Sequence, residues 1–444
     1  MIDVSLLTDQ LHAAAPQAIL LTEPDDVKLF AIDGVTPRLA ALPASAEEVA
    51  AIMKYAAEQH LTVLPFGGGT DLGLGQPPER YDLAVSTTRL NALLEHEAAD
   101  LTCSVQAGIT LADLQQRLKT KGQFLALDPP NPEHATIGGI LASNASGPQR
   151  LRYGSARDLV IGLRVVLADG TIARSGGKVV KNVAGYDLNK LYIGSLGTLG
   201  IIVEANFKLI PCPEQEQTLL VAFESAEQGM RAVISLLSSV VTPTALELLD
   251  PAAQQAIQQH TRQTLPACAA LLAISFAGGA KAVARQIDDT RALTKRSGGN
   301  PAGLLESDAH TRFWDAVRNQ QNGPVTCKVS LLMSEIAPFL ASAQNICQEH
   351  RLTPSAIAHA GSGVIYLQLQ PADATERLAS AIIQLRALAQ SHKGSLVVTR
   401  APASLKAQIN VWGEPRPDLK LMQTLKQKFD PTGTLAKGRF IGGL

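Results

Sequence analysis

Hydrophobic residues recur along the first half of the chain with two spacings, which predict alternating helices and strands. Residues 45–60 place Val49 and Ile52 on one helical face, and Ser45 before them is suited to cap the first turn. The apolar run LTVLPF, residues 61–66, follows directly and predicts a strand. The same reasoning predicts strands around 82–86, 101–107, 159–168 and 199–210 and a helix at 110–121, whereas 128–155 shows no strong period.

The pattern changes at PCPE, residues 211–214, where two prolines and a charge indicate a linker. Beyond it, strands alternate with helices, which predicts an α+β domain. The predicted order is TLLVAF as a strand, a helix at 225–239, ALELLD as a strand, a helix at 251–260, AALLAISF as a strand and a helix at 280–297. A last helix ends at Asp430-Pro431. The predicted domains are 1–213, 214–408 and a C-terminal segment, 409–444.

Length and composition narrow the class of protein. At roughly 150 residues per domain, 444 residues allow two or three domains. A net charge of −1 without a basic tract argues against nucleic acid as a partner. No basic segment opens the N-terminus and no apolar run approaches the ~18–20 residues of a membrane span, so we expect a cytoplasmic protein. Five scattered cysteines fit a reducing compartment and exclude an iron–sulfur ligand set within this chain.

Three glycine-rich segments are the strongest chemical signals. In LPFGGGTDLG, the amides of Gly67 to Asp71 can point into one concavity that attracts a phosphate, although a plain turn between strands explains the glycines equally well. The second segment, DPPNPEHATIGGILASNASGP, offers small side chains against which a flat ring could lie; its His134 is most simply a surface residue. The third, GSLGTLGII at 194–202, lets the backbone approach a ligand closely.

Taken together, these segments resemble the FAD-binding oxidoreductases of the vanillyl-alcohol-oxidase or p-cresol-methylhydroxylase (PCMH) type, over residues 35–211 and again in KFDPTGTLAKGRF. In that last stretch Ala436-Lys437 stands where the family usually has Asn-Pro. The run KNVAGYDL, 181–188, is most similar to the FAD-binding E-type subunits of bacterial glycolate oxidase. The resemblance implies an α+β protein in which a PCMH-type FAD-binding domain of two α/β subdomains is joined to an α+β, ferredoxin-like cap.

The resemblance also implies which residues hold FAD. The pyrophosphate falls at Gly67–Asp71, the flavin near the second segment and the adenine near Ile202. The cofactor-binding candidates are Pro65, Gly67, Gly68, Gly69, Thr70, Asp71, Pro129, Thr136, Gly138, Gly139, Ser143, Asn144, Gly147, Gly154, Gly197 and Ile202. Some members carry FAD on a histidine beside the first loop. Thr70 and Asp71 stand there in this chain, which implies non-covalent FAD.

The family's substrate site looks incomplete in this chain. Related 2-hydroxyacid dehydrogenases have HxGDGNxH and a later GSxSxEHG-like run, whose histidines and glutamate bind a metal and act on the substrate. This chain has HAGSGVIY, which keeps His359 but has Tyr366 at the second histidine, and GSLVVTRA, which has Arg400 at the last histidine. A single ligand does not hold a catalytic metal, so we expect no metal site. In this interpretation His359 is a hydrogen-bonded turn residue.

One helix could still bind a substrate carboxylate. FWDAVRN places Trp314 and Arg318 on one face, and the family often uses an arginine in such a run. An ordinary amphipathic helix with an exposed arginine is the simpler explanation.

Two functions of this class remain open. The chain is either an FAD-binding subunit of a glycolate or D-lactate dehydrogenase complex, or a self-sufficient FAD oxidoreductase that uses Tyr366, Arg400 and Arg318. In the first case it works with a catalytic D-type flavoprotein and an iron–sulfur F-type subunit, which could hold it at the inner face of the membrane. A scaffold without FAD is a third possibility, against which the three glycine segments argue.

Overall fold

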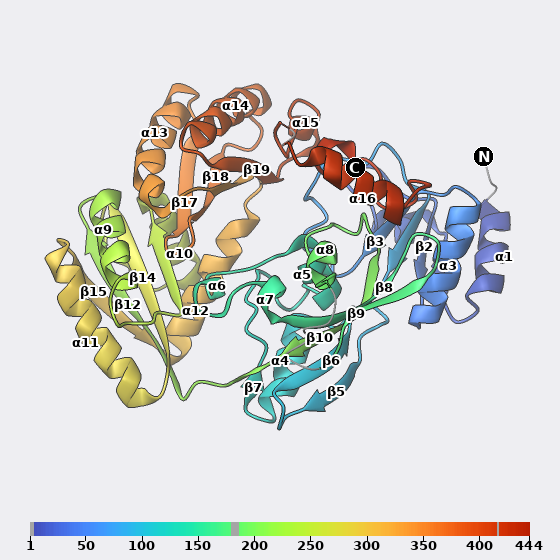
Figure 1. The fold of residues 1–444 in the computed structure, drawn as a ribbon. Coiled ribbons are helices and arrows are strands. Elements are labelled where there is room, and N and C mark those ends of the chain that lie inside the picture. The colour runs from blue at the N-terminus through green and yellow to red at the C-terminus, as the bar shows by residue number, and fades with distance from the viewer. Residues whose placement is uncertain (1–3, 179–185, 415–416) are drawn as a thin grey trace. The chain divides into compact units, whose positions relative to one another are not determined.

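The structure is a computed structural model that describes residues 4–178, 186–414 and 417–444. The residues group into two compact units (Figure 1). The first unit comprises 1–145, 155–212 and 414–444, and the second comprises 146–154 and 213–413. The short stretch 146–154 therefore belongs with the second unit, although it is flanked on both sides by the first. Most of the KNVAGYDL run, residues 181–185, lies outside the described residues.

A four-stranded sheet begins the first unit. Strands β2 (Leu39–Leu42), β4 (Leu83–Ser86) and β3 (Val63–Phe66) are parallel, and β1 (Ile19–Leu21) pairs with β2 in the antiparallel sense. Helices α1 (Val4–Ala14) and α3 (Ala46–Glu58) bury their apolar faces in one cluster with these strands. The hydroxyl of Ser45 accepts the Glu48 amide at 3.1 Å, which confirms the predicted cap.

The first unit also contains a five-stranded antiparallel sheet. Its order is β5 (Leu93–Glu97), β6 (Thr102–Gln106), β10 (Ile201–Lys208), β8 (Val160–Val166) and β9 (Ile172–Gly176). The remaining elements of this unit are α2 (Pro24–Lys28), α4 (Leu111–Lys119), β7 (Gln123–Phe124), α5 (Ile137–Ser143), α7 (Ala156–Leu159), α8 (Asn189–Tyr192), β11 (Ile210–Pro211), α16 (Leu419–Phe429) and η3 (Ile441–Gly443). Helix α5 lies within residues 128–155, where the sequence shows no clear period. Two of its seven residues are glycines, and these interrupt the apolar pattern by which a helix is recognised.

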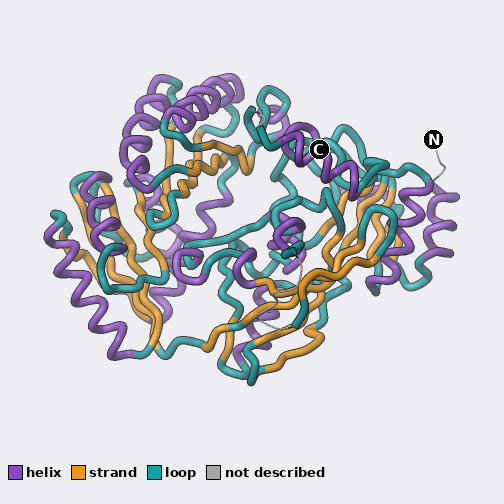
Figure 2. Tube along the Cα trace, viewed as in Figure 1, coloured by secondary structure: helices purple, strands orange, loops and turns teal. Residues whose placement is uncertain are grey.

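The second unit is built on one eight-stranded antiparallel sheet (Figure 2). Its order is β15 (Asn300–Glu306), β12 (Gln215–Phe223), β14 (Ala270–Gly278), β13 (Ala245–Leu249), β17 (Thr353–His359), β18 (Val364–Gln370), β16 (Thr326–Ser330) and β19 (Ser395–Arg400). Helices α9 (Ala226–Leu237), α11 (Ala280–Arg296), α13 (Ile336–Glu349) and α14 (Thr375–Ser391) share one core with this sheet. Helices α10 (Pro251–Thr261) and α12 (Ser307–Asn319) form a second core on its other face.

Short elements complete the second unit: α6 (Arg150–Tyr153), η1 (Gln320–Asn322), η2 (Met333–Glu335) and α15 (Ala403–Lys406). The alternating helices and strands predicted for this half are confirmed, and the fold is of the α+β kind. In the described part of the chain, no helix has both the length and the apolar character that crossing a bilayer requires.

Asp250 ties α10 to the sheet and makes the stability of the second unit depend on pH. Its carboxylate accepts the amides of Ala253 and Ala356, each at 2.7 Å. Burial raises the pKa of Asp250 from 3.8 to about 6, against the opposing effect of these amides. The folded chain therefore binds more protons here than the unfolded chain between these two values, so this group's contribution to stability falls as the pH rises through that window.

We expect the melting temperature of the wild type, relative to Asp250→Asn, to decrease as the pH is raised from about 4 to about 6. Scanning calorimetry of both proteins across this range measures the difference. Parallel pH curves for the two proteins would contradict the assignment.

Candidate cofactor site

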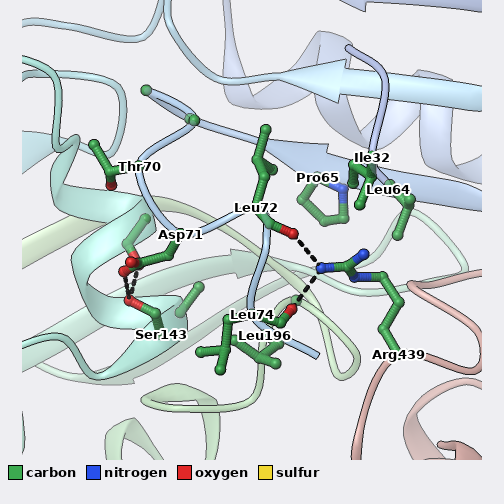
Figure 3. Close-up of a pocket in the computed structure, with 16 residues that line it drawn as sticks. Ile32, Leu64, Pro65, Thr70, Asp71, Leu72, Leu74, Ser143, Leu196 and Arg439 are labelled. Atoms are coloured by element: carbon green, nitrogen blue, oxygen red, sulfur yellow. Dashed lines mark hydrogen bonds between the residues drawn. The ribbon is translucent and has the colours of Figure 1, made fainter. Parts of the chain in front are cut away.

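The first glycine segment leaves β3 and forms one wall of a cleft in the first unit. The cleft holds about 640 Å³ of space, part of it open to solvent (Figure 3). Its lining residues are Ile32, Leu64, Pro65, Gly67, Gly68, Gly69, Thr70, Asp71, Leu72, Leu74, Gly139, Ala142, Ser143, Leu196, Gly197 and Arg439. A smaller cleft of about 390 Å³ shares five of these residues and extends to Ile202. All three glycine-rich segments therefore meet at one place.

Thr136 holds the first two segments together. Its hydroxyl oxygen accepts the amides of Gly68 and Gly139, each at 3.3 Å, and so caps α5 while it joins α5 to the loop. A Cβ on Gly67 would lie 2.2 Å from this oxygen, and a Cβ on Gly68 would lie 1.6 Å from the carbonyl oxygen of His134. These glycines are required because the two backbones touch.

The third segment leads into β10 and lines both clefts. Gly197 has a φ of +73°, and a Cβ there would lie 2.8 Å from Cγ of Pro65. Gly200, Ile201 and Ile202 continue into the smaller cleft. Here too, the lack of a side chain lets the loop lie directly against β3.

Two charged side chains lie among the residues that line the larger cleft, Asp71 and Arg439. The hydroxyl of Ser143 donates to Asp71 at 2.7 Å. The guanidinium of Arg439 donates to the carbonyl oxygens of Leu72 and Leu74, both at 2.6 Å, and thereby braces the loop after the glycines (Figure 3). Burial lowers the pKa of Arg439, against the opposing effect of Asp33 and Tyr81.

The predicted cofactor residues divide into three groups. Most of them line one of the two clefts: Pro65, Gly67, Gly68, Gly69, Thr70, Asp71, Gly138, Gly139, Ser143, Gly197 and Ile202. Thr136 supports the wall, and Asn144 ends α5 in the left-handed conformation. Neither cleft is lined by Pro129, and Gly147 and Gly154 belong to the second unit. Sequence reasoning missed Arg439, which lies about 370 residues from the loop it braces.

In the second unit, the structure gives His359 a partner that sequence reasoning missed. Glu247 on β13 faces His359 across the sheet, and Oε1 lies 2.6 Å from Nδ1. The two side chains are 0% and 2% exposed. Burial raises the pKa of the Glu247 carboxyl well above its usual range. The hydrogen bond between the two side chains satisfies one polar atom of each where water does not reach them.

Tyr366 extends this polar cluster on the same sheet. Its ring meets the His359 ring edge to face, with centroids 5.3 Å apart, and Nζ of Lys328 lies 5.9 Å from the Tyr366 centroid. Arg400 ends β19 in register with Thr326. Within the described ranges, no three His, Cys, Asp or Glu side chains are grouped so that they could hold a metal ion.

The side chain of Arg318 is less exposed than the sequence predicted. It lies on α12 and pairs with Asp315, and its side chain is 16% exposed. Trp314 is buried and donates to the hydroxyl of Thr218 at 2.7 Å, which fixes the helix on the sheet.

Comparison with known proteins identifies the family of this chain. Residues 37–176 match the FAD binding domain, and residues 212–440 match the C-terminal domain of FAD linked oxidases. The chain belongs to the FAD-linked oxidase family. It is 30% identical to glycolate oxidase subunit GlcD of Bacillus subtilis, over 90% of this chain and 88% of that one. It is 29% identical to D-2-hydroxyglutarate dehydrogenase of Xanthomonas citri, over 97% and 96%.

Solved structures support the fold. The structure of p-cresol methylhydroxylase superposes with a TM-score of 0.79 at 17% identity, covering 97% of this chain and 95% of that one. The PCMH-type fold is thereby confirmed, and FAD is the cofactor of this oxidoreductase.

The residues of the cleft fit FAD. The loop at 67–71 lines the cleft with almost no side-chain bulk, so its backbone can lie close to a phosphate, and its close contacts with Thr136 and His134 hold it against α5. Bound FAD supplies the two-electron acceptor for oxidation of a substrate. The loop at 67–71 would hold the cofactor, with Thr136 joining this loop to α5 and Arg439 bracing the residues that follow it.

Proposed function

We propose that this chain is the FAD-binding subunit of a dehydrogenase complex for small 2-hydroxyacids such as glycolate or D-lactate. The match over 90% of the chain to a relative named glycolate oxidase subunit GlcD supports the hydroxyacid class. The assignment of a non-catalytic role within the complex rests instead on Tyr366 and Arg400, which stand where the family has histidines. Relatives named D-lactate dehydrogenase in Danio rerio and Anaerostipes hadrus support the substrate class. In this proposal a D-type flavoprotein oxidises the acid, and an F-type iron–sulfur subunit takes the electrons onward.

The roles of the domains follow from the same proposal. Residues 1–213 and the returning segment 409–444 hold FAD, and 214–408 form the cap, whose metal site has been lost. Tyr366 and Arg400 stand where the family has histidines of the substrate site. Their presence supports the proposal that another subunit oxidises the acid.

The purified chain is expected to be yellow, with a flavin band near ~450 nm, and not to be bleached by glycolate or D-lactate under anaerobic conditions. Bleaching should appear when the D-type partner is added. Stopped-flow absorbance with each acid, with and without the partner, measures this. Rapid bleaching of the isolated chain would overturn the division of labour and leave the hydroxyacid class standing.

One observation favours a second candidate, a self-sufficient FAD oxidoreductase of a small carboxylate substrate. The pair of Glu247 and His359, together with Tyr366 and Lys328, gives the cap a cluster of titratable side chains that the sequence did not predict. In this case Tyr366, Arg400 and Arg318 handle the substrate. The same anaerobic experiment separates the two candidates, since reduction without a partner would favour this one.

A further inference from the structure

A largely enclosed lysine of α16 joins separate parts of the FAD-binding unit. The ammonium group of Lys426 donates to the carbonyl oxygens of Thr198 at 2.9 Å and Leu435 at 2.7 Å, and to Oδ2 of Asp430 at 2.6 Å. These three bonds use the three protons of the group. The side chains of Lys426 and Asp430 are 12% and 0% exposed.

Asp430 shapes the turn that follows the helix. Its carboxylate accepts the amides of Thr434 and Leu435, both at 2.8 Å. The turn then runs beside β3: the amide of Val63 donates to Thr434 at 2.7 Å, and the amide of Ala436 donates back to Val63 at 2.9 Å. Three residues later, Arg439 braces the loop at Leu72 and Leu74.

Lys426 also reaches the third glycine-rich segment. Thr198 follows Gly197, which lines both clefts and lies against Pro65. One ion pair therefore links the 194–202 loop to the C-terminal turn, and the turn to β3, from which the glycine loop begins.

We propose that Lys426 and Asp430 form a latch that holds the walls of the FAD cleft in register, so that Lys426 is a positioning residue for FAD retention. A buried ion pair adds little net stability because both groups lose their hydration, and in some proteins such a pair serves to select one arrangement over others. Burial lowers the pKa of Lys426, and Asp430 opposes this shift. Preorganised walls lower the ordering cost of binding the cofactor. The latch does not depend on which acid the complex oxidises.

The test compares FAD affinity with stability in full-length variants. Lys426→Met removes all three bonds, Lys426→Gln keeps two donors, and Lys428→Met on the same helix is the matched control because Lys428 is exposed. After the flavin is removed, FAD is titrated back and its fluorescence quenching gives Kd. The rate at which fluorescence returns after dilution of the complex gives the dissociation rate. Circular dichroism of each apoprotein gives its melting temperature, and all titrations are made well below the lowest of these.

Lys426→Met is expected to raise the Kd of FAD at least tenfold, mainly through faster dissociation, whereas Lys428→Met stays within twofold. A purely structural role would lower the apoprotein melting temperature and leave Kd unchanged, and that result overturns the proposal. Since Lys426→Met leaves the Asp430 carboxylate buried without its cation, the double variant Lys426→Met/Asp430→Asn is included in case the single variant does not fold. The double variant is expected to fold and still bind FAD at least tenfold more weakly; wild-type affinity in it would also overturn the latch.

Discussion

Replacing Gly68 with alanine is expected to lower FAD affinity by at least ~100-fold, equivalent to about 2.7 kcal/mol. The new Cβ would lie 1.6 Å from the carbonyl oxygen of His134. That oxygen belongs to the backbone and cannot rotate away, so the loop must leave the segment that carries Thr136. The bond from the Gly68 amide to Thr136 is lost in the same movement. The flavin-to-protein absorbance ratio after gel filtration, followed by FAD titration, measures the effect.

The control for this variant is Gly177→Ala. Gly177 lies in the same unit, has a φ outside the left-handed region, and has no atom within 4 Å of the added Cβ. It should retain FAD as the wild type does. A Gly68→Ala protein that folds normally, by circular dichroism, and binds FAD with wild-type affinity would show that the loop does not contact the cofactor.

Replacing Glu247 with alanine is expected to lower the free energy of unfolding by about 3 kcal/mol, the typical cost of removing one partner of a buried pair. Both side chains are almost fully buried, so the His359 Nδ1 that bonds to Glu247 would lose its partner where water does not replace it. Glu247→Gln keeps the size and an oxygen acceptor and should cost less. Urea denaturation followed by fluorescence and circular dichroism gives both values.

A second histidine–carboxylate pair in the same unit provides the control. Glu335 and His392 are 2.7 Å apart, but their side chains are 33% and 20% exposed. Water solvates either partner when the other is removed, so Glu335→Ala should change stability little. Equal losses for the two alanine variants would mean that burial does not set the strength of the Glu247–His359 pair.

Local sequence determined the elements of both units. Ser45 before an apolar helical face places the start of α3, and the alternation of strands and helices after residue 214 predicts the α+β layer. The glycine loop was recognisable for the same reason, because three consecutive glycines after a strand allow a backbone that few other residues adopt. Resemblance to a flavoprotein family then connected three segments that spacing alone could not join.

Tertiary structure decided which distant groups became partners. Glu247 appeared only as one polar residue within an apolar strand, and it is the register of β13 with β17 that brings it to His359. Arg439 and Lys426 reach the glycine loop and Thr198 because the chain returns to β3 more than 200 residues later. Contacts between residues so far apart in the sequence depend on how the strands pair and on where the C-terminal segment packs. The local pattern of apolar and polar residues contains no information on either point.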